Sequence, residues 1–145
     1  MKHGPERADY PALNEWFSRV HNRSTNGEGS RGELRALRGS IGEAMSPATL
    51  KGLVCTQPYG YPGDFEIIDR IYVRHISADP CFMRWDAYFH AQAATKAVRN
   101  RKDYCHRLLD SHYCREKPLR VLNVASGPGR CMFEWLSSHP EAEVS

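Results

Sequence analysis

A chain of 145 residues can form one compact domain and is too short for two full-sized ones. Its charged fraction of 26% and hydrophobic fraction of 41% fit a globular protein and exclude wholesale disorder. The net charge of +3 is too small to argue for a nucleic-acid partner. The sequence has neither a secretory signal nor the roughly 18 apolar residues of a membrane span, so a cytoplasmic protein with no membrane partner is expected.

The five cysteines indicate neither a disulfide framework nor a metal site. Their number is odd and no two form a C-x-x-C motif, so reduced and mostly buried thiols are expected. Two cysteines and two histidines stand close together in CHRLLDSHYC, residues 105–114. The spacings of zinc sites are missing there, and on a helix only Cys105 and His112 would share a face. No metal is therefore expected.

Apolar residues recur every three or four positions through the first third of the chain, which predicts helices. The first is expected over residues 10–20. A second helical stretch, residues 31–45, contains two glycines that argue against one unbroken helix. A third is expected over residues 47–55, because Ser46 can cap it and Pro47 suits its first position.

The stretch TQPYGYPGDFEIIDRIYVRH, residues 56–75, joins a loop rich in proline, glycine and tyrosine to a helix. Asp64 can cap this helix, whose apolar residues share one face. They are Ile67, Ile68, Ile71 and Tyr72. Asp79 and Pro80 then open a further helix, which either runs on to about Tyr113 or breaks near residues 90–94. Its exposed side is basic and carries Arg99, Arg101, Lys102 and Arg107.

The last 30 residues have a different pattern, which predicts the start of an α/β domain. LRVLNV, residues 119–124, predicts a strand, ASGPG a tight loop, and RCMFEWLSSHP a helix that ends before Pro140. In that helix Met132, Phe133 and Leu136 are expected to face inward, and EAEVS to begin a second strand. The expected fold is mainly α: a helical N-terminal cap region over residues 1–115, then the first β-α unit of a Rossmann-like (α/β) core, incomplete, over residues 116–145.

A strand, a glycine-rich turn and a helix predict a ligand site at the end of the strand. Glycine lets the backbone approach the ligand, and the helix N-terminus offers N–H donors with a partial positive charge. The dinucleotide fingerprint is excluded, since Met132 stands where its third glycine belongs. A Walker loop is excluded as well, because Gly129 is followed by Arg130 and Cys131.

The remaining pattern, LNVASGPGR, resembles the first motif of class I S-adenosylmethionine-dependent methyltransferases. Ala125 holds the place of the first glycine, Gly127 and Gly129 hold the next two, and Asn123 stands where an aspartate is common. QPYGYPGDFEIIDRIY, AVRNRKDYCHRLL and SGPGR, in that order, resemble one group of bacterial methyltransferases. Their helical N-terminal region carries a PYGY-x-GD segment. The resemblance spans roughly residues 50–136.

This resemblance implies a cofactor, S-adenosylmethionine, and residues that hold it. The methionine part would be wrapped by Ala125, Ser126, Gly127, Pro128, Gly129 and Arg130. Arg99 and Arg101 would close over the cofactor or the substrate, where an arginine could pair with the cofactor's carboxylate.

The PYGYPGD loop supplies the catalytic candidates, Tyr61 and Asp64. Tyr59 and Tyr61 offer aromatic faces to the positive sulfonium. Asp64 could orient or deprotonate the acceptor, although helix capping competes for the same oxygens. The methyl acceptor is not fixed by the resemblance.

In a complete core of this family a second strand ends in an acidic residue that holds the ribose, and here that strand is only starting at Ser145. We therefore expect a fragment that binds cofactor weakly or not at all and does not turn over. Its unpaired strand could join two copies in a homodimer. The alternative is a helical interaction module that binds a protein or nucleic acid through the basic face of residues 99–107.

Overall fold

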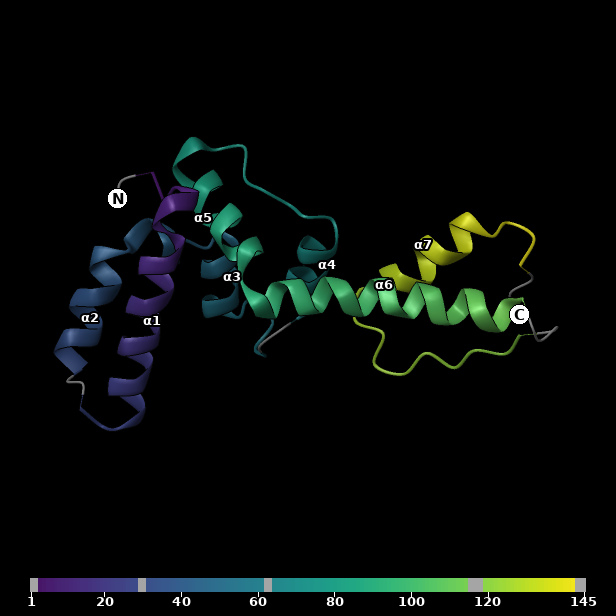
Figure 1. The fold of residues 1–145 in the computed structure, drawn as a ribbon, viewed down its shortest axis with the longest axis horizontal. Helices are drawn as coiled ribbons and strands as arrows, with labels where there is room; N and C mark the ends of the chain where they lie inside the picture. The colour runs from purple at the N-terminus through teal and green to yellow at the C-terminus, as the bar shows by residue number, and fades with distance from the viewer. Residues whose placement is uncertain (1–2, 29–30, 62–63, 115–118, 143–145) are drawn as a thin grey trace. The chain divides into compact units, whose positions relative to one another are not determined.

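The computed structural model describes residues 3–28, 31–61, 64–114 and 119–142 (Figure 1). Within these ranges the chain forms seven α-helices, two short 3₁₀-helices and no strand, which confirms the prediction of a mainly α chain. The elements are η1 (Arg7–Asp9), α1 (Tyr10–Thr25), α2 (Arg31–Ser40), η2 (Gly42–Met45), α3 (Leu50–Thr56), α4 (Phe65–Tyr72), α5 (Pro80–Ala91), α6 (Ala93–Tyr113) and α7 (Arg130–Ser138). No helix in the described ranges is both long and apolar enough to span a membrane.

The helices belong to two compact units, each described by itself. Unit 1 combines Met1–Pro62 with Ile76–Ala91 and contains α1, α2, α3 and α5. Unit 2 combines Gly63–His75 with Gln92–Ser145 and contains α4, α6 and α7. The predicted division near residue 115 separates a helical region from a Rossmann-like domain, and it stays a prediction.

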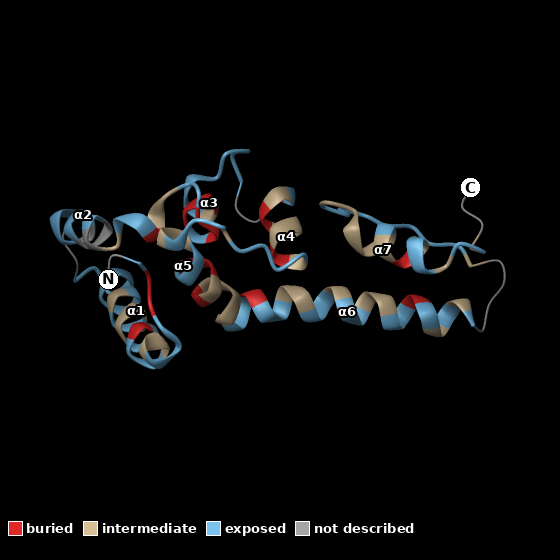
Figure 2. Ribbon diagram, turned by 90° about the horizontal axis from the view of Figure 1, so that it is seen from above, coloured by how far each residue is buried: buried red, intermediate tan, exposed pale blue. Residues whose placement is uncertain are grey.

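Unit 1 is built around an apolar cluster. Leu13 of α1, Ala44 of η2, and Trp85 and Tyr88 of α5 are buried together. Figure 2 shows buried segments of α1 and α5 in red. Tyr10 packs its ring edge-on against Tyr88, with the ring centroids 5.0 Å apart. The helix predicted over residues 10–20 is thus confirmed, and it extends to Thr25.

Helix α3 begins later than the sequence predicts, and the predicted Ser46 cap is wrong. Its N-cap is Thr49, whose side-chain oxygen accepts a hydrogen bond from the Gly52 N–H at 2.9 Å. The preceding chain passes so close that a Cβ on Gly52 would lie 1.8 Å from the Ser46 carbonyl oxygen. Ser46 is therefore outside the helix and against its first turn, where it cannot act as the cap.

Two helix breaks occur where the sequence predicts them. In the 31–45 stretch, α2 ends at Ser40 and the 3₁₀-helix η2 begins at Gly42. The helix that Pro80 opens ends at Ala91, and α6 begins at Ala93, so the predicted break near residues 90–94 is confirmed against the alternative of one long helix. Asp79 accepts a hydrogen bond from the Cys81 N–H at 2.9 Å, as expected of a residue at a helix start.

In unit 2, α4 and α7 both pack along the long helix α6 (Figure 1). Four apolar side chains of these helices are buried: Ile67, Ile71, Leu109 and Trp135. The α7 helix lies where the sequence predicts it, but Phe133 was wrongly expected inside, since it is 68% exposed and Trp135 only 3%.

The segment predicted as the first strand, residues 119–124, is irregular in the structure, and residues 120–124 are exposed. Leu122 is 88% exposed and Val124 75%. A strand is completed by the hydrogen bonds of a neighbouring strand, and the described residues offer none. EAEVS, residues 141–145, is expected to begin the second strand, and residues 143–145 lie outside the described residues.

Candidate functional site

The loop predicted to bind the cofactor forms a sharp turn, residues 125–129, called here the glycine turn. Three of its five residues have left-handed backbones: φ is +54° at Ala125, +57° at Gly127 and +68° at Gly129. The Gly129 N–H donates to the Ser126 carbonyl at 3.1 Å and closes the turn. For Ala125 this backbone costs roughly 1 kcal/mol, because its Cβ crowds the carbonyl oxygen.

The glycine turn is open to its surroundings. Residues 125–127 are exposed, and a Cβ built on Gly127 or Gly129 would meet no atom within 4 Å. These glycines therefore serve the backbone conformation and leave the space beside the main chain free. The turn leads directly into α7, whose first N–H groups have no partner within the helix by geometry.

Arg130, the first residue of α7, is held by carboxylates. Its Nε and one terminal nitrogen bind both oxygens of Asp69 on α4, the second at 2.8 Å, and another nitrogen lies 3.5 Å from Glu134. Glu134 also accepts from Lys102 of α6 at 2.5 Å. These four residues, the ion-pair cluster, have side chains only 15% to 33% exposed, so solvent screens them less than a surface pair.

The ion-pair cluster shifts the pKa values of its members. The hydrogen bond from Arg130 lowers the pKa of Asp69 and outweighs the opposing effect of burial. Burial alone would raise the pKa of Glu134, but the hydrogen bonds and charges of Lys102 and Arg130 together lower it. The hydrogen bond to Asp69 raises the pKa of Arg130. Asp69, Glu134 and Arg130 are therefore charged at neutral pH.

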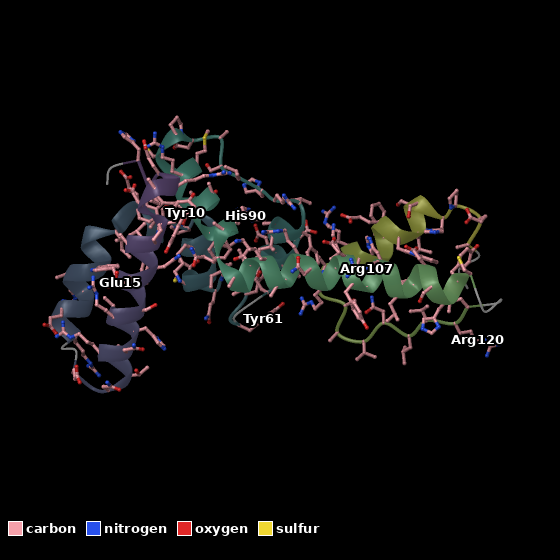
Figure 3. All side chains as sticks on the ribbon, viewed as in Figure 1. Tyr10, Glu15, Tyr61, His90, Arg107 and Arg120 are labelled. Atoms are coloured by element: carbon pink, nitrogen blue, oxygen red, sulfur yellow. The ribbon has the colours of Figure 1, made fainter. Side chains whose placement is uncertain are left out.

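The two arginines predicted to close over the cofactor lie on α6. Arg101 donates to the hydroxyl of Tyr72 on α4 at 3.4 Å, and the ammonium of Lys102 lies 5.6 Å from the centre of the same ring. Arg99 is partly buried, and burial together with the charge of Arg74 lowers its pKa. Arg107 is exposed farther along α6 (Figure 3).

Asp64 acts as a helix cap in the structure. It is 2% exposed, and one carboxylate oxygen accepts from the Ile67 N–H at 3.0 Å, which confirms the capping prediction. A role as catalytic base would need its other oxygen, and it stays a prediction. Tyr61 lies on the loop after α3 in unit 1, about half exposed, and its predicted role is likewise untested (Figure 3).

The cysteines are free thiols, but they are less buried than predicted, since Cys55 and Cys114 are exposed. Burial and a hydrogen bond with Cys105 raise the pKa of Cys131 to about 12. Cys131 therefore stays a thiol at neutral pH and is a poor nucleophile. Among the residues that the structure describes, no three His, Cys, Asp or Glu side chains are placed to hold a metal ion.

Sequence reasoning missed the two acids of the ion-pair cluster. Glu134 follows Arg130 by four residues, a helical spacing that would have revealed their pairing. Asp69 stands 61 residues before Arg130, and no local pattern connects the two.

Comparison with known protein families, with curated proteins and with solved structures found no match to this chain.

Proposed function

We propose that this chain is the N-terminal portion of an S-adenosylmethionine-dependent methyltransferase. The glycine turn would hold the methionine part of the cofactor, and residues 119–124 would become the first strand of a Rossmann-like core once a neighbouring strand pairs with them. The observation that carries the proposal is the turn itself: three left-handed residues, open space beside both glycines, and a helix N-terminus directly behind.

The charges beside the turn favour a ligand without phosphates. Arg130 would be the natural partner of a phosphate at this helix N-terminus. Its guanidinium is instead bound by Asp69 and lies beside Glu134. S-adenosylmethionine carries a sulfonium, an ammonium and a carboxylate but no phosphate, so it suits a turn whose neighbouring cation is already neutralised.

Methyl transfer makes modest demands on the protein. The acceptor forms a bond to the methyl carbon while the bond from that carbon to sulfur breaks and its electron pair stays on sulfur, so the cofactor leaves as a thioether and no protein nucleophile is needed. Holding the two reactants in line provides much of the catalysis. In this proposal Asp64 orients or deprotonates the acceptor, and Arg99 or Arg101 pairs with the cofactor's carboxylate.

The test is calorimetric titration of S-adenosylmethionine into the whole product of the reading frame that encodes this chain. We expect saturable binding that Gly127→Val abolishes. The valine side chain fills the open space, and a β-branched residue does not readily adopt a φ of +57°. Gly27→Val is the matched control. Gly27 also has a positive φ, +72°, and no atom within 4 Å of a built Cβ, but it lies between α1 and α2.

Residues 1–145 by themselves should bind the cofactor weakly or not at all. Absence of heat with the whole product would defeat the proposal. Equal binding by Gly127→Val and the parent protein would show that the ligand does not use the turn. Salt-sensitive retention of residues 1–145 on a nucleic acid, without any cofactor binding, would favour the alternative interaction module.

A further inference from the structure

The ion-pair cluster joins the glycine turn to a helix far away in sequence. Asp69 lies on α4 and binds Arg130 through two parallel hydrogen bonds, a geometry that fixes direction as well as distance. Arg130 immediately follows Gly129, the last residue of the turn. Asp69 therefore holds the side chain of the first residue after the turn.

A second link fixes the same helical turn from α6. Lys102 binds Glu134 at 2.5 Å, and Glu134 in turn lies 3.5 Å from Arg130. The first turn of α7 is thus tied to α4 by Asp69 and to α6 by His106, whose Nε2 lies 2.9 Å from the Cys131 carbonyl oxygen, while Lys102 holds Glu134 one turn later. The remainder of α7 has a separate attachment at Trp135, whose indole N–H donates to Asp110 of α6 at 2.7 Å.

We infer that Asp69 is a positioning residue for the glycine turn: by gripping Arg130 it sets the direction of the turn's backbone and of the first N–H groups of α7. As far as the ligand is concerned, this inference rests on the proposed function. Because Trp135 anchors α7 independently, loss of Asp69 should loosen the turn while the helix stays docked.

The experiment compares three variants of the whole product. Asp69→Asn removes the negative charge and replaces one of the two acceptor oxygens with an NH₂ group. Asp69→Glu keeps a carboxylate at this position. Arg70→Gln is the matched control, since Arg70 pairs with Glu66 within α4, with side chains of similar exposure, 31% and 29%. Amide ¹⁵N relaxation at Gly127, Gly129 and Cys131 reports on the turn without any ligand. The Trp135 indole resonance reports on the docking of α7.

We expect Asp69→Asn to lower the order parameters of the turn and to leave the Trp135 resonance in place. Affinity for S-adenosylmethionine should fall about tenfold, as expected for neighbouring coupled residues. Asp69→Glu should recover most of both effects, and Arg70→Gln should change neither.

Three outcomes test the positioning role of Asp69 separately from the proposed function. Unchanged relaxation in Asp69→Asn overturns the positioning role. Equal loss of order at the turn and at Trp135 also overturns it, since Asp69 would then only stabilise unit 2. If the parent protein binds no S-adenosylmethionine but Asp69→Asn still loosens the turn, the positioning role stands and the cofactor assignment falls.

Discussion

The two units hold their helices together by different means. Unit 1 packs buried rings and aliphatic side chains of α1, η2 and α5, and its ion pairs lie at the surface, with side chains 49% to 70% exposed. In unit 2 the pairs that Lys102 forms with Glu134 and Arg130 forms with Asp69 have side chains only 15% to 33% exposed. Several large apolar residues of unit 2, such as Leu122, Val124 and Phe133, lie instead on its outside.

This difference indicates what each unit is suited for. Surface pairs of the kind seen in unit 1 contribute little, so that unit depends on apolar burial. The partly buried ion pairs of unit 2 fix the orientation of the side chains that form them, which suits a segment that presents a backbone turn. Exposed apolar residues on the 119–124 segment are what an unpaired first strand would leave, in agreement with the proposed Rossmann-like core.

The largest expected effect on stability is at Trp135, the buried apolar residue that anchors α7. Its ring stacks on His139 with centroids 4.4 Å apart and is 3% exposed. Trp135→Ala should lower the free energy of unfolding by about 4 kcal/mol through the cavity and the lost indole hydrogen bond. Phe133→Ala on the same helix should change it by less than about 0.5 kcal/mol. Urea unfolding of both variants tests this, and similar costs would mean that α7 is turned differently.

The close packing at the start of α3 in unit 1 can be tested by adding one methyl group at Gly52. Gly52→Ala places a Cβ 1.8 Å from a backbone oxygen, so the Ser46 chain must move, and we expect a loss of about 3 kcal/mol. Gly39→Ala in α2 is the control, since nothing lies within 4 Å of its Cβ. There alanine should stabilise by up to about 1 kcal/mol. Thermal unfolding measures both, and a neutral Gly52→Ala would refute the close approach.

Unit 1 also contains a buried carboxyl side chain, that of Asp86. Asp86 is fully buried and accepts from the Leu50 N–H at 2.8 Å and the Ser77 N–H at 2.9 Å. Asp86→Ala leaves both donors without their acceptor and should cost about 2 kcal/mol in urea unfolding. Asp86→Asn keeps one acceptor and should cost less. If alanine proves no worse than asparagine, these hydrogen bonds do not stabilise α3.

The sequence predicts features that local chemistry decides. Asp64 caps α4 because a carboxylate three residues before a backbone N–H is enough, whatever surrounds it. The helix of residues 130–138 likewise follows from its apolar spacing.

Features decided by a distant neighbour escape the sequence. Ser46 and Pro47 form a good start signal, but the helix begins at Leu50 with Thr49 as its cap, so a start signal by itself does not determine the first residue. Phe133 and Trp135 are both apolar, and only the position of α6 determines which one faces inward. The sequence does not predict that Asp69 pairs with Arg130, because the pairing depends on how α4 and α7 pack. The glycine turn, by contrast, is predicted by its own residues.

The smallest expected effect concerns pH and distinguishes the ion-pair cluster from a surface pair. Because Arg130 lowers the pKa of Asp69 from its ordinary value of 3.8, the folded carboxylate holds its proton less tightly than the unfolded one. The unfolded chain then binds more protons in acid, so the stabilisation is present at neutral pH and is lost as the pH falls below that value through the lowered pKa. Asp69→Asn cannot titrate and provides the baseline. For a pair about one-third exposed, the parent protein should exceed this variant by about 1 kcal/mol at pH 7.

The measurement is urea unfolding of the parent protein and of Asp69→Asn at several pH values between 7 and 2.5. The difference in free energy of unfolding should shrink steadily below pH 4 and approach zero at the acid end, since a protonated Asp69 resembles asparagine. Asp69→Glu should keep the pH dependence, because a carboxylate can still meet Arg130. A difference that stays constant across this range would mean that the pairing does not persist in solution. The directional link from α4 to the glycine turn would then be lost, and with it the contrast between the two units.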